Sequence, residues 1–277
     1  MKEISLERGR DDQAGVVRLT LNRPEKLNAQ TVQMWNHMAR LGKELAADDS
    51  IRVLVVAGAG RSFSAGIDIT TFTSPSAPVV PDTGATNGDD TATESGVESI
   101  LAIQRAFTWL EDAPYVTIAK VQGHAFGAGM QLALACDLRF VADDVKMGLL
   151  ELNWGLMPDL GGTVWLPRLV GPAKALEMMI TGARLGADEL LALGIVNRVV
   201  ARAELDSTVD GFVSDLLKRP PLAVRGAKAA VRGGLGEPSP VGMRAAAVAQ
   251  LACLQSADFA EAGAAFVEGR EPRFGGH

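Results

Sequence analysis

The stretch "GHAFGAGMQLALACD", residues 123–137, places three glycines within seven residues and then runs into an apolar segment. Glycine allows a ligand or another chain segment to approach the backbone closely, because it has no Cβ atom. The first turn of a helix also carries N–H groups without intrahelical partners, and these groups can bind an incoming acceptor. The stretch therefore predicts a ligand-binding turn at the start of a helix.

The segments around this turn alternate between strand and helix patterns. β-branched runs that end in turn residues predict strands at 16–22, 51–58, 115–123, 138–142 and 195–200. Apolar residues at helical spacing predict helices at 31–47, 98–112 and 127–136. Strands that alternate with helices imply parallel crossovers, so the predicted fold class is α/β.

The composition of the chain changes near residue 202, where strand patterns stop and Ala-rich helical patterns such as 243–255 and 258–269 begin. This change predicts a core at 1–200 and a helical C-terminal region at 201–277.

The overall composition argues against several classes of partner. The net charge is −6 and no cluster of Lys and Arg is present, so we expect no nucleic-acid partner. No run of 18 apolar residues occurs and the N-terminus lacks an apolar targeting region, so we expect a cytoplasmic protein with no membrane partner. Cys136 and Cys253 lie in apolar helical patterns, which predicts small buried residues. The three histidines, His37, His124 and His277, lack metal-ligand spacing, so we expect no metal and favour surface or structural roles.

Residues 70–97 are rich in Thr, Ser, Pro, Gly and Asp. A loop of this length in a compact domain is usually functional or disordered. We favour a mobile lid, and plain disorder remains the alternative.

The glycine motifs exclude the common nucleotide-binding and hydrolase patterns. Leu132 stands where a dinucleotide-binding motif needs its third glycine, and neither a P-loop nor a G-x-S-x-G motif occurs. Two similar turns remain, "FSAGID" at 63–68 and "FGAGMQ" at 126–131, each after a predicted strand. Side by side they would point two N–H groups at one carbonyl oxygen, which is an oxyanion hole. The alternative is that these glycines only allow helices to pack closely on strands.

Five blocks of the sequence resemble the enoyl-CoA hydratase/isomerase (crotonase) superfamily in order and spacing: "LNRPEKLNA" (21–29), "GAGRSFSAGID" (58–68), "GHAFGAGMQLALACDLRFVADD" (123–144), "ELNWGLMPDLGGTVWLPRLVG" (151–171) and "DFAEAGAAFVEGREPRF" (258–274). The resemblance implies a crotonase (ClpP-like) spiral of repeated β-β-α units with a helical C-terminal trimerisation region. It also implies an acyl-CoA thioester substrate and a homotrimer or dimer of trimers. No separate cofactor is expected, because coenzyme A is carried by the substrate.

The resemblance also assigns roles to individual residues. The two N–H groups of the oxyanion hole fall on Ile67 and Ala128, and Glu151 matches the later of two glutamates that hydratases of the family carry. The earlier glutamate is replaced by Gln131, which cannot transfer a proton at neutral pH. Asp159 matches the second carboxylate of dienoyl-CoA isomerases, and its alternative role is to cap the helix that begins near Gly162. Coenzyme A contacts fall on Lys26, Leu27, Ala65, Asp68 and Ile69, although the usual cation after this block is missing.

One catalytic carboxylate favours isomerisation of an enoyl-CoA, since a single base can remove a proton at C2 and return it at C4. Apolar neighbours in sequence, including Leu149, Leu152 and Trp154, predict a desolvated Glu151 with a raised pKa, which suits a general acid/base. The alternatives are a hydratase in which Gln131 positions the water and a non-catalytic protein that binds acyl-CoA.

Overall fold

The computed structural model of the chain describes residues 3–70, 90–237 and 239–277. Its main sheet has six strands in the order β1-β2-β3-β4-β6-β9. Neighbouring strands are parallel from β2 onwards, and β1 pairs antiparallel with β2 at the edge. The strands are β1 (Ile4–Arg8), β2 (Val16–Leu21), β3 (Val53–Gly58), β4 (Val116–Val121), β6 (Leu138–Ala142) and β9 (Arg198–Val200). The predicted α/β class is therefore confirmed.

A smaller sheet carries the short strands that follow β4 and β6. It consists of β5 (His124–Phe126), β7 (Lys146–Gly148) and β8 (Leu185–Gly186), and a bridge joins Ser64 to Ala125 beside it. Thus β4 is followed by β5 and α4 (Ala128–Ala135), and β6 is followed by β7, the short 3-10 helix η3 (Glu151–Trp154) and further helices. This repeat is the predicted β-β-α spiral.

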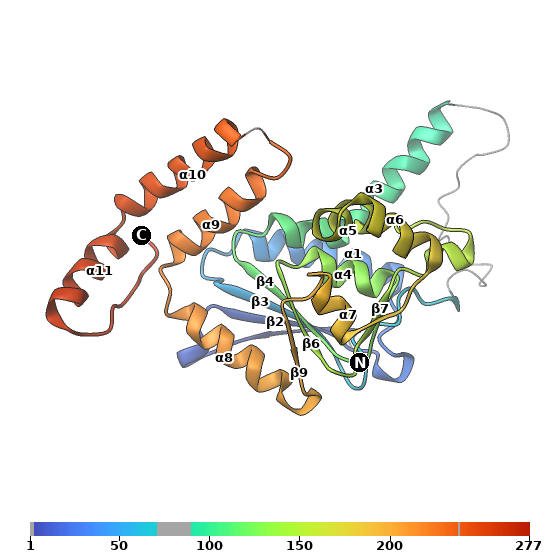
Figure 1. Cartoon of the computed structure of the whole chain (residues 1–277), viewed down its shortest axis with the longest axis horizontal. Helices are drawn as coiled ribbons and strands as arrows, with labels where there is room; N and C mark the ends of the chain where they lie inside the picture. The colour runs from blue at the N-terminus through green and yellow to red at the C-terminus, as the bar shows by residue number, and fades with distance from the viewer. Residues whose placement is uncertain (1–2, 71–89, 238) are drawn as a thin grey trace.

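The two faces of the main sheet pack against different helices. One face packs with α1 (Val32–Ala46), α3 (Asp90–Asp112), α4, α5 (Gly162–Val170), α6 (Pro172–Thr181) and α7 (Ala187–Ala192). The other face is covered by Leu205, Val209 and Val213 of α8 (Leu205–Leu217). The arrangement follows from the alternation of side chains along each strand, since Val16, Val53 and Ile118 point to the α8 face and their neighbours to the larger core. The helices that pack with the larger core thus all lie on one side of the sheet, opposite α8 (Figure 1).

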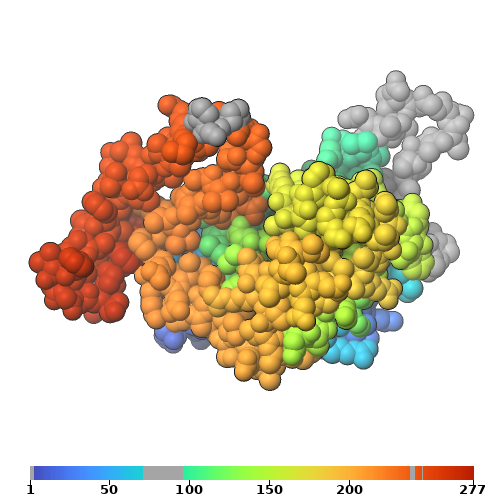
Figure 2. All heavy atoms as spheres, viewed as in Figure 1, coloured from blue at the N-terminus to red at the C-terminus, as the bar shows by residue number. Residues whose placement is uncertain are grey.

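Three helices extend from this body at the C-terminal end of the chain: α9 (Pro221–Gly233), α10 (Ser239–Leu254) and α11 (Ala257–Glu268). Figures 1 and 2 show α10 and α11 as an arm that projects away from the sheet. Cys136 is buried in the core, as predicted, whereas Cys253 on α10 is only half-buried. Across the described residues, no helix is both long enough and apolar enough to span a membrane.

The sequence-based boundaries needed several corrections. Residues 71–89 of the predicted lid lie outside the described residues, and residues 90–97 belong to α3 rather than to a loop. A helix extends at little cost once its first turn has formed, so the helix predicted at 98–112 can extend over the weaker helix formers at 90–97. The patterns did not predict β1, β5, β7 or β8, which are short or lie at an edge, and residues 195–197 lack the predicted strand. The remaining 3-10 helices are η1 (Asp11–Gln13), η2 (Pro24–Lys26) and η4 (Arg202–Glu204).

Candidate active site

The two glycine-bearing turns lie against each other through their backbones. The Ser64 N–H donates to the His124 carbonyl at 2.9 Å, and the Phe126 N–H donates to the Ser64 carbonyl at 3.0 Å. Gly129 is required for this approach, since a Cβ atom built on it would stand 2.4 Å from the Ser64 carbonyl oxygen. The glycines therefore allow close packing, and the same packing brings the turns of both motifs together.

The predicted pair of N–H donors, Ile67 and Ala128, lies at this junction. A Cβ atom on Gly66, the residue before Ile67, would stand 2.8 Å from the Phe126 carbonyl oxygen and 3.8 Å from the Ala128 nitrogen. Gly66 has a φ of +100°, which other residues rarely adopt. Among the backbone hydrogen bonds of the described residues, none has the Ile67 or Ala128 N–H as its donor. Both groups therefore remain able to bind an acceptor.

Glu151 lies beside the second turn and makes contact through only one of its oxygens. Gln131 Nε2 donates to Glu151 Oε1 at 2.7 Å, and a Cβ atom on Gly127 would stand 3.2 Å from the same oxygen. The second oxygen, Oε2, is buried and has no partner among the described residues. Burial raises the pKa of Glu151 and so does the nearby Asp159, although hydrogen bonds from Gln131 and the backbone oppose them. The predicted rise in pKa is confirmed.

The reason given for that rise was only partly correct. Leu149 is buried, but Leu152 and Trp154 are 39% and 62% exposed and do not cover the carboxylate. Sequence neighbours on a 3-10 helix point in different directions, so proximity along the chain did not report proximity in space. The described contacts of the Glu151 carboxylate come instead from α4 and the turn before it.

Gln131 has a defined orientation in this site. The Gly162 N–H, at the start of α5, donates to Gln131 Oε1 at 2.9 Å. The amide oxygen therefore faces Gly162 and the amide nitrogen must face Glu151. This direct contact leaves no room for a water between Gln131 Nε2 and Glu151 Oε1.

Asp159 does not cap the helix that follows it, contrary to the alternative considered from the sequence. The N-cap of α5 is Gly161, and the side chain that accepts from the first N–H of this helix, that of Gly162, is Gln131 rather than Asp159. The backbone carbonyl of Asp159 accepts a hydrogen bond from Gln104 Nε2 of α3 at 2.8 Å. This contact does not involve the Asp159 carboxyl group. Burial raises the pKa of Asp159. The negative charge of Asp159 also raises the pKa of Glu151, so the two carboxyl groups interact electrostatically.

The residues predicted to bind coenzyme A lie around the first turn. Lys26 is exposed, and the Leu27 carbonyl accepts the Ala65 N–H at 2.9 Å, so the two segments are held together. Ile69 is 51% exposed. Asp68 is buried and its carboxylate pairs with Arg23 Nη2 at 2.9 Å, which assigns its side chain to holding the turn.

Sequence reasoning missed two groups that shape the site. Arg23 anchors Asp68 and the Ala29 carbonyl, and its position directly after the first predicted strand gave no signal for these partners. Gly162 orients Gln131, and the pair Gly161–Gly162 before an apolar run was a usable sign of a helix start. His124 is exposed and stacks on Phe126, which agrees with the predicted surface role. Over the described ranges, no group of three or more His, Cys, Asp or Glu side chains could hold a metal ion.

The chain is similar to known proteins over nearly its whole length. The sequence model of the enoyl-CoA hydratase/isomerase family matches residues 11–277. A peroxisomal Δ(3,5)-Δ(2,4)-dienoyl-CoA isomerase of Arabidopsis thaliana is 31% identical over 94% of this chain and 93% of its own length. A crotonyl-CoA hydratase of Syntrophomonas wolfei is 33% identical over 92% of this chain and 93% of its own. A Thermobifida fusca protein solved in complex with CoA has a TM-score of 0.79 and 36% identity, covering 91% of this chain and 93% of the other.

Proposed function

Because the chain belongs to the enoyl-CoA hydratase/isomerase family, we propose that it shifts a double bond in an enoyl-CoA thioester with Glu151 as its single acid/base. One observation carries this choice of reaction. Gln131 occupies Glu151 Oε1 as a hydrogen-bond donor, while Glu151 Oε2 is buried without a partner among the described residues. A site with one free carboxylate oxygen suits a reaction that moves one proton between two carbons.

The mechanism follows from the positions of these groups. The thioester oxygen binds to the Ile67 and Ala128 N–H groups, which stabilise the enolate as negative charge develops there. Glu151 Oε2 removes a proton from C2 of a 3-enoyl-CoA and returns it at C4, which moves the double bond from C3 to C2. Burial raises the pKa of Glu151 towards the range in which a carboxyl group both accepts and releases a proton.

Incubation with a 3-enoyl-CoA and, separately, with a 2-enoyl-CoA tests this proposal. We expect conversion of the 3-enoyl-CoA to its conjugated isomer, and little water addition to the 2-enoyl-CoA. Hydration that exceeds isomerisation would refute the proposal and favour the hydratase alternative. Binding of both thioesters without conversion of either would indicate a protein that only binds acyl-CoA.

A second candidate reaction is the isomerisation of a 3,5-dienoyl-CoA to the 2,4-dienoyl-CoA. It is favoured by Asp159, whose pKa is raised by burial and whose charge acts on Glu151. Two carboxyl groups of raised pKa can take a proton at one carbon and supply one at a more distant carbon. A 3,5-dienoyl-CoA assay distinguishes the two candidates, since only this reaction should require Asp159.

The substrate's coenzyme A is proposed to bind along Lys26, Leu27, Ala65, Asp68 and Ile69. The exposed Lys26 and Ile69 offer a cation and an apolar side chain to the solvent-facing side of the first turn. A Lys26→Ala variant should raise the KM for the thioester and leave kcat nearly unchanged, because Lys26 lies away from the reacting carbons.

The core at 1–200 is proposed to hold the acyl-CoA site, while the helical region at 201–277 serves oligomerisation into a homotrimer or dimer of trimers. The arm exposes large apolar residues, with Phe266 88% and Val267 84% exposed. Light scattering should give three or six chains per particle, and Phe266→Glu should lower that number. A monomeric wild-type protein would refute this assignment.

A further inference from the structure

Gly162, whose N–H orients Gln131, is held in place by the packing of the first turn of α5. Gly162 begins α5, and the N-cap residue Gly161 lies directly on the Trp165 ring. A Cβ atom built on Gly161 would stand 2.1 Å from Trp165 Cζ3, so no other residue fits there. Trp165 is 5% exposed, and its Nε1–H donates to Glu111 Oε2 at 2.7 Å. The first turn of α5 therefore rests on a ring that Glu111 fixes.

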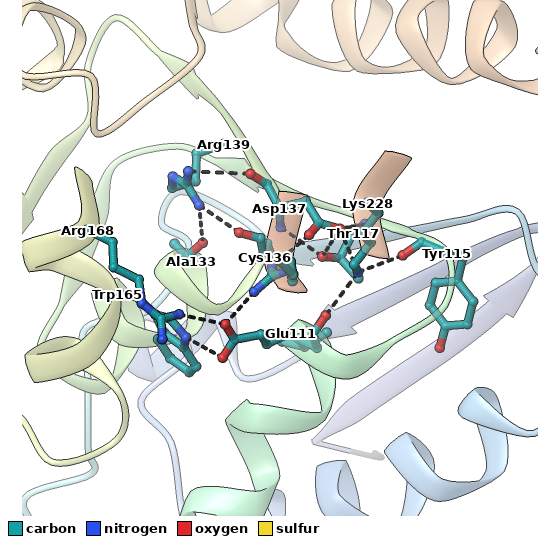
Figure 3. A network of polar contacts seen from close by, with 12 residues as sticks. Glu111, Tyr115, Thr117, Ala133, Cys136, Asp137, Arg139, Trp165, Arg168 and Lys228 are labelled. Atoms are coloured by element: carbon teal, nitrogen blue, oxygen red, sulfur yellow. Dashed lines mark hydrogen bonds and ion pairs between the residues drawn. The ribbon is translucent and has the colours of Figure 1, made fainter. Parts of the chain in front are cut away.

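Glu111, near the end of α3, joins this ring to two cations. Its Oε1 accepts from Arg168 Nη1 at 2.8 Å and pairs with Arg232 Nη1 at 2.6 Å. Figure 3 shows the Glu111 carboxylate facing Trp165 and Arg168. Burial raises the pKa of Glu111, but the Trp165 hydrogen bond and the Arg232 and Arg168 charges together place it below its ordinary value. Glu111 is thus a carboxylate at neutral pH and binds all three donors.

Arg232 connects Glu111 to the end of the other active-site helix. Its Nη2 donates to Asp137 Oδ1 at 2.7 Å, and Asp137 follows α4 directly. Asp137 Oδ2 accepts the Thr117 N–H of β4 at 2.8 Å and pairs with Lys228 Nζ at 2.8 Å. The far end of α4 is therefore tied to the central sheet and to α9, the helix that carries Arg232 and Lys228 (Figure 3).

These contacts form one continuous path from α9 to the reacting carboxylate. We propose that Arg232 is a positioning residue for the active site: through Glu111 and Trp165 it fixes the start of α5, so that Gly162 keeps Gln131 against Glu151. Because Arg232 also holds the end of α4, on which Gln131 lies, one residue sets the spacing between both helices that meet at Gln131. The C-terminal helices then contribute to catalysis without touching the substrate.

The pH dependence of the reaction reports this positioning. The hydrogen bond from Gln131 favours the ionised form of Glu151, so loosening it raises the pKa of Glu151. Asp159, on the loop before α5, is the titratable group that acts on Glu151, and it raises the same pKa. The groups presented by α4 and α3 at this place, Gln131 and Gln104, are neutral. A change in the path should therefore move the acid limb of the kcat profile to higher pH.

Two variants interrupt the path at different points. Glu111→Gln keeps the shape of the side chain but cannot accept from Trp165 and both arginines at once. Arg232→Met removes the bridge between Glu111 and Asp137. Arg225→Met is the matched control, because Arg225 also docks α9, through the Asp49 and Ile51 carbonyls, but touches neither carboxylate. Circular dichroism and the thermal midpoint establish that each variant is folded.

We expect kcat to fall about tenfold in Glu111→Gln and Arg232→Met, with KM within about twofold, because a small displacement of a catalytic group lowers turnover more than binding. The acid limb should move to higher pH in both. The double variant should shift it by less than the sum of the two single shifts, as expected for residues that share one path. Arg225→Met should leave the acid limb in place.

This inference rests on the proposed function only in taking Glu151 as the proton acceptor. A second measurement therefore tests the inference separately from the proposed reaction. Bound acetoacetyl-CoA can lose its C2 proton, and its enolate absorbs in the near ultraviolet. The pH midpoint of this band should rise in Glu111→Gln. A wild-type midpoint in that variant, or an equal rise in Arg225→Met, would overturn the inference. Hydration by an enzyme that keeps the predicted shift would overturn only the isomerase assignment.

Discussion

Replacing Glu151 by Gln tests two effects of this carboxylate, its contribution to turnover and the effect of its burial on the free energy of unfolding. The substitution keeps the side-chain shape, and the new amide oxygen can still accept the hydrogen bond from Gln131 that Oε1 accepts now at 2.7 Å. It removes the carboxylate that is proposed to take the C2 proton. General acid/base residues typically contribute 10²–10⁴-fold, so kcat should fall by about that factor, or about 3–5 kcal/mol of activation free energy.

The same variant should become relatively more stable as pH rises. Burial raises the pKa of Glu151 in the folded protein above its ordinary value of 4.5, so the folded state binds this proton more tightly than the unfolded state. The stabilisation by the protonated form is complete below the unfolded pKa and is lost as pH rises through the folded pKa. Each unit of difference corresponds to about 1.36 kcal/mol. Gln at this position does not titrate and avoids the loss.

Denaturant unfolding of both proteins between pH 4 and pH 8 measures this difference. The unfolding free energy of Glu151→Gln minus that of the wild type should increase across the window and then level off above the folded pKa. Glu151→Asp serves as a control that keeps a titrating carboxyl group. A difference that stays flat with pH would show that Glu151 is not desolvated. Near-full turnover in Glu151→Gln would remove it from the mechanism.

Three further changes test other parts of the site. Gln131→Glu places a second carboxyl group in hydrogen-bond contact with Glu151, so one of the two must hold a proton. The ratio of hydration to isomerisation should therefore rise. An unchanged ratio would show that residue 131 does not select the reaction. Gly66→Ala adds a Cβ atom 2.8 Å from the Phe126 carbonyl oxygen at a φ of +100°, and the resulting separation of the two N–H donors should lower kcat at least tenfold. Gly211→Ala, at a helical site where a Cβ atom meets nothing within 4 Å, should leave kcat unchanged. Equal effects of the two substitutions would refute the role of the junction between the turns. Asp159→Asn removes a charge that raises the pKa of Glu151, so the acid limb of the monoenoyl reaction should move to lower pH, and a limb that stays in place would contradict the coupling.

The parts of the site that depend on the backbone could be predicted from the sequence. Gly66, Gly127 and Gly129 mark the two turns, and the structure places these turns against each other for the steric reason that glycine implies. The assignment of the paired N–H donors to Ile67 and Ala128 rests on the family resemblance, and the packing of the two turns is consistent with it. Strand patterns located the central strands β2, β3, β4 and β6 to within a few residues, because their side chains are buried and β-branched.

The contacts between side chains of distant segments could not be predicted in this way. Gln131 and Glu151 are twenty positions apart, and nothing in their local patterns shows that they touch. The alternative role of Asp159 as a helix cap was predicted from its local sequence, and it is wrong because Gly161, two residues later, is the N-cap of α5. The path through Glu111, Trp165 and Arg232 joins three helices that the sequence shows only as separate amphipathic segments.

The directions of the two hydrogen bonds at Gln131 explain how this residue can set the number of protons that the site holds. The Gly162 N–H can only donate, so whichever group stands at position 131 must present an acceptor to it. Glutamine then has only its NH2 group left for Glu151, and this donor favours an ionised Glu151. Glutamate would accept the same N–H at the start of α5, where a helix favours negative charge, and its remaining oxygen would meet an oxygen of Glu151. That pair needs a shared proton to exist at neutral pH. Under the proposed function, residue 131 therefore decides whether the resting site holds no proton and one base, which suits isomerisation, or one proton and two carboxyl groups, which suits the addition of water.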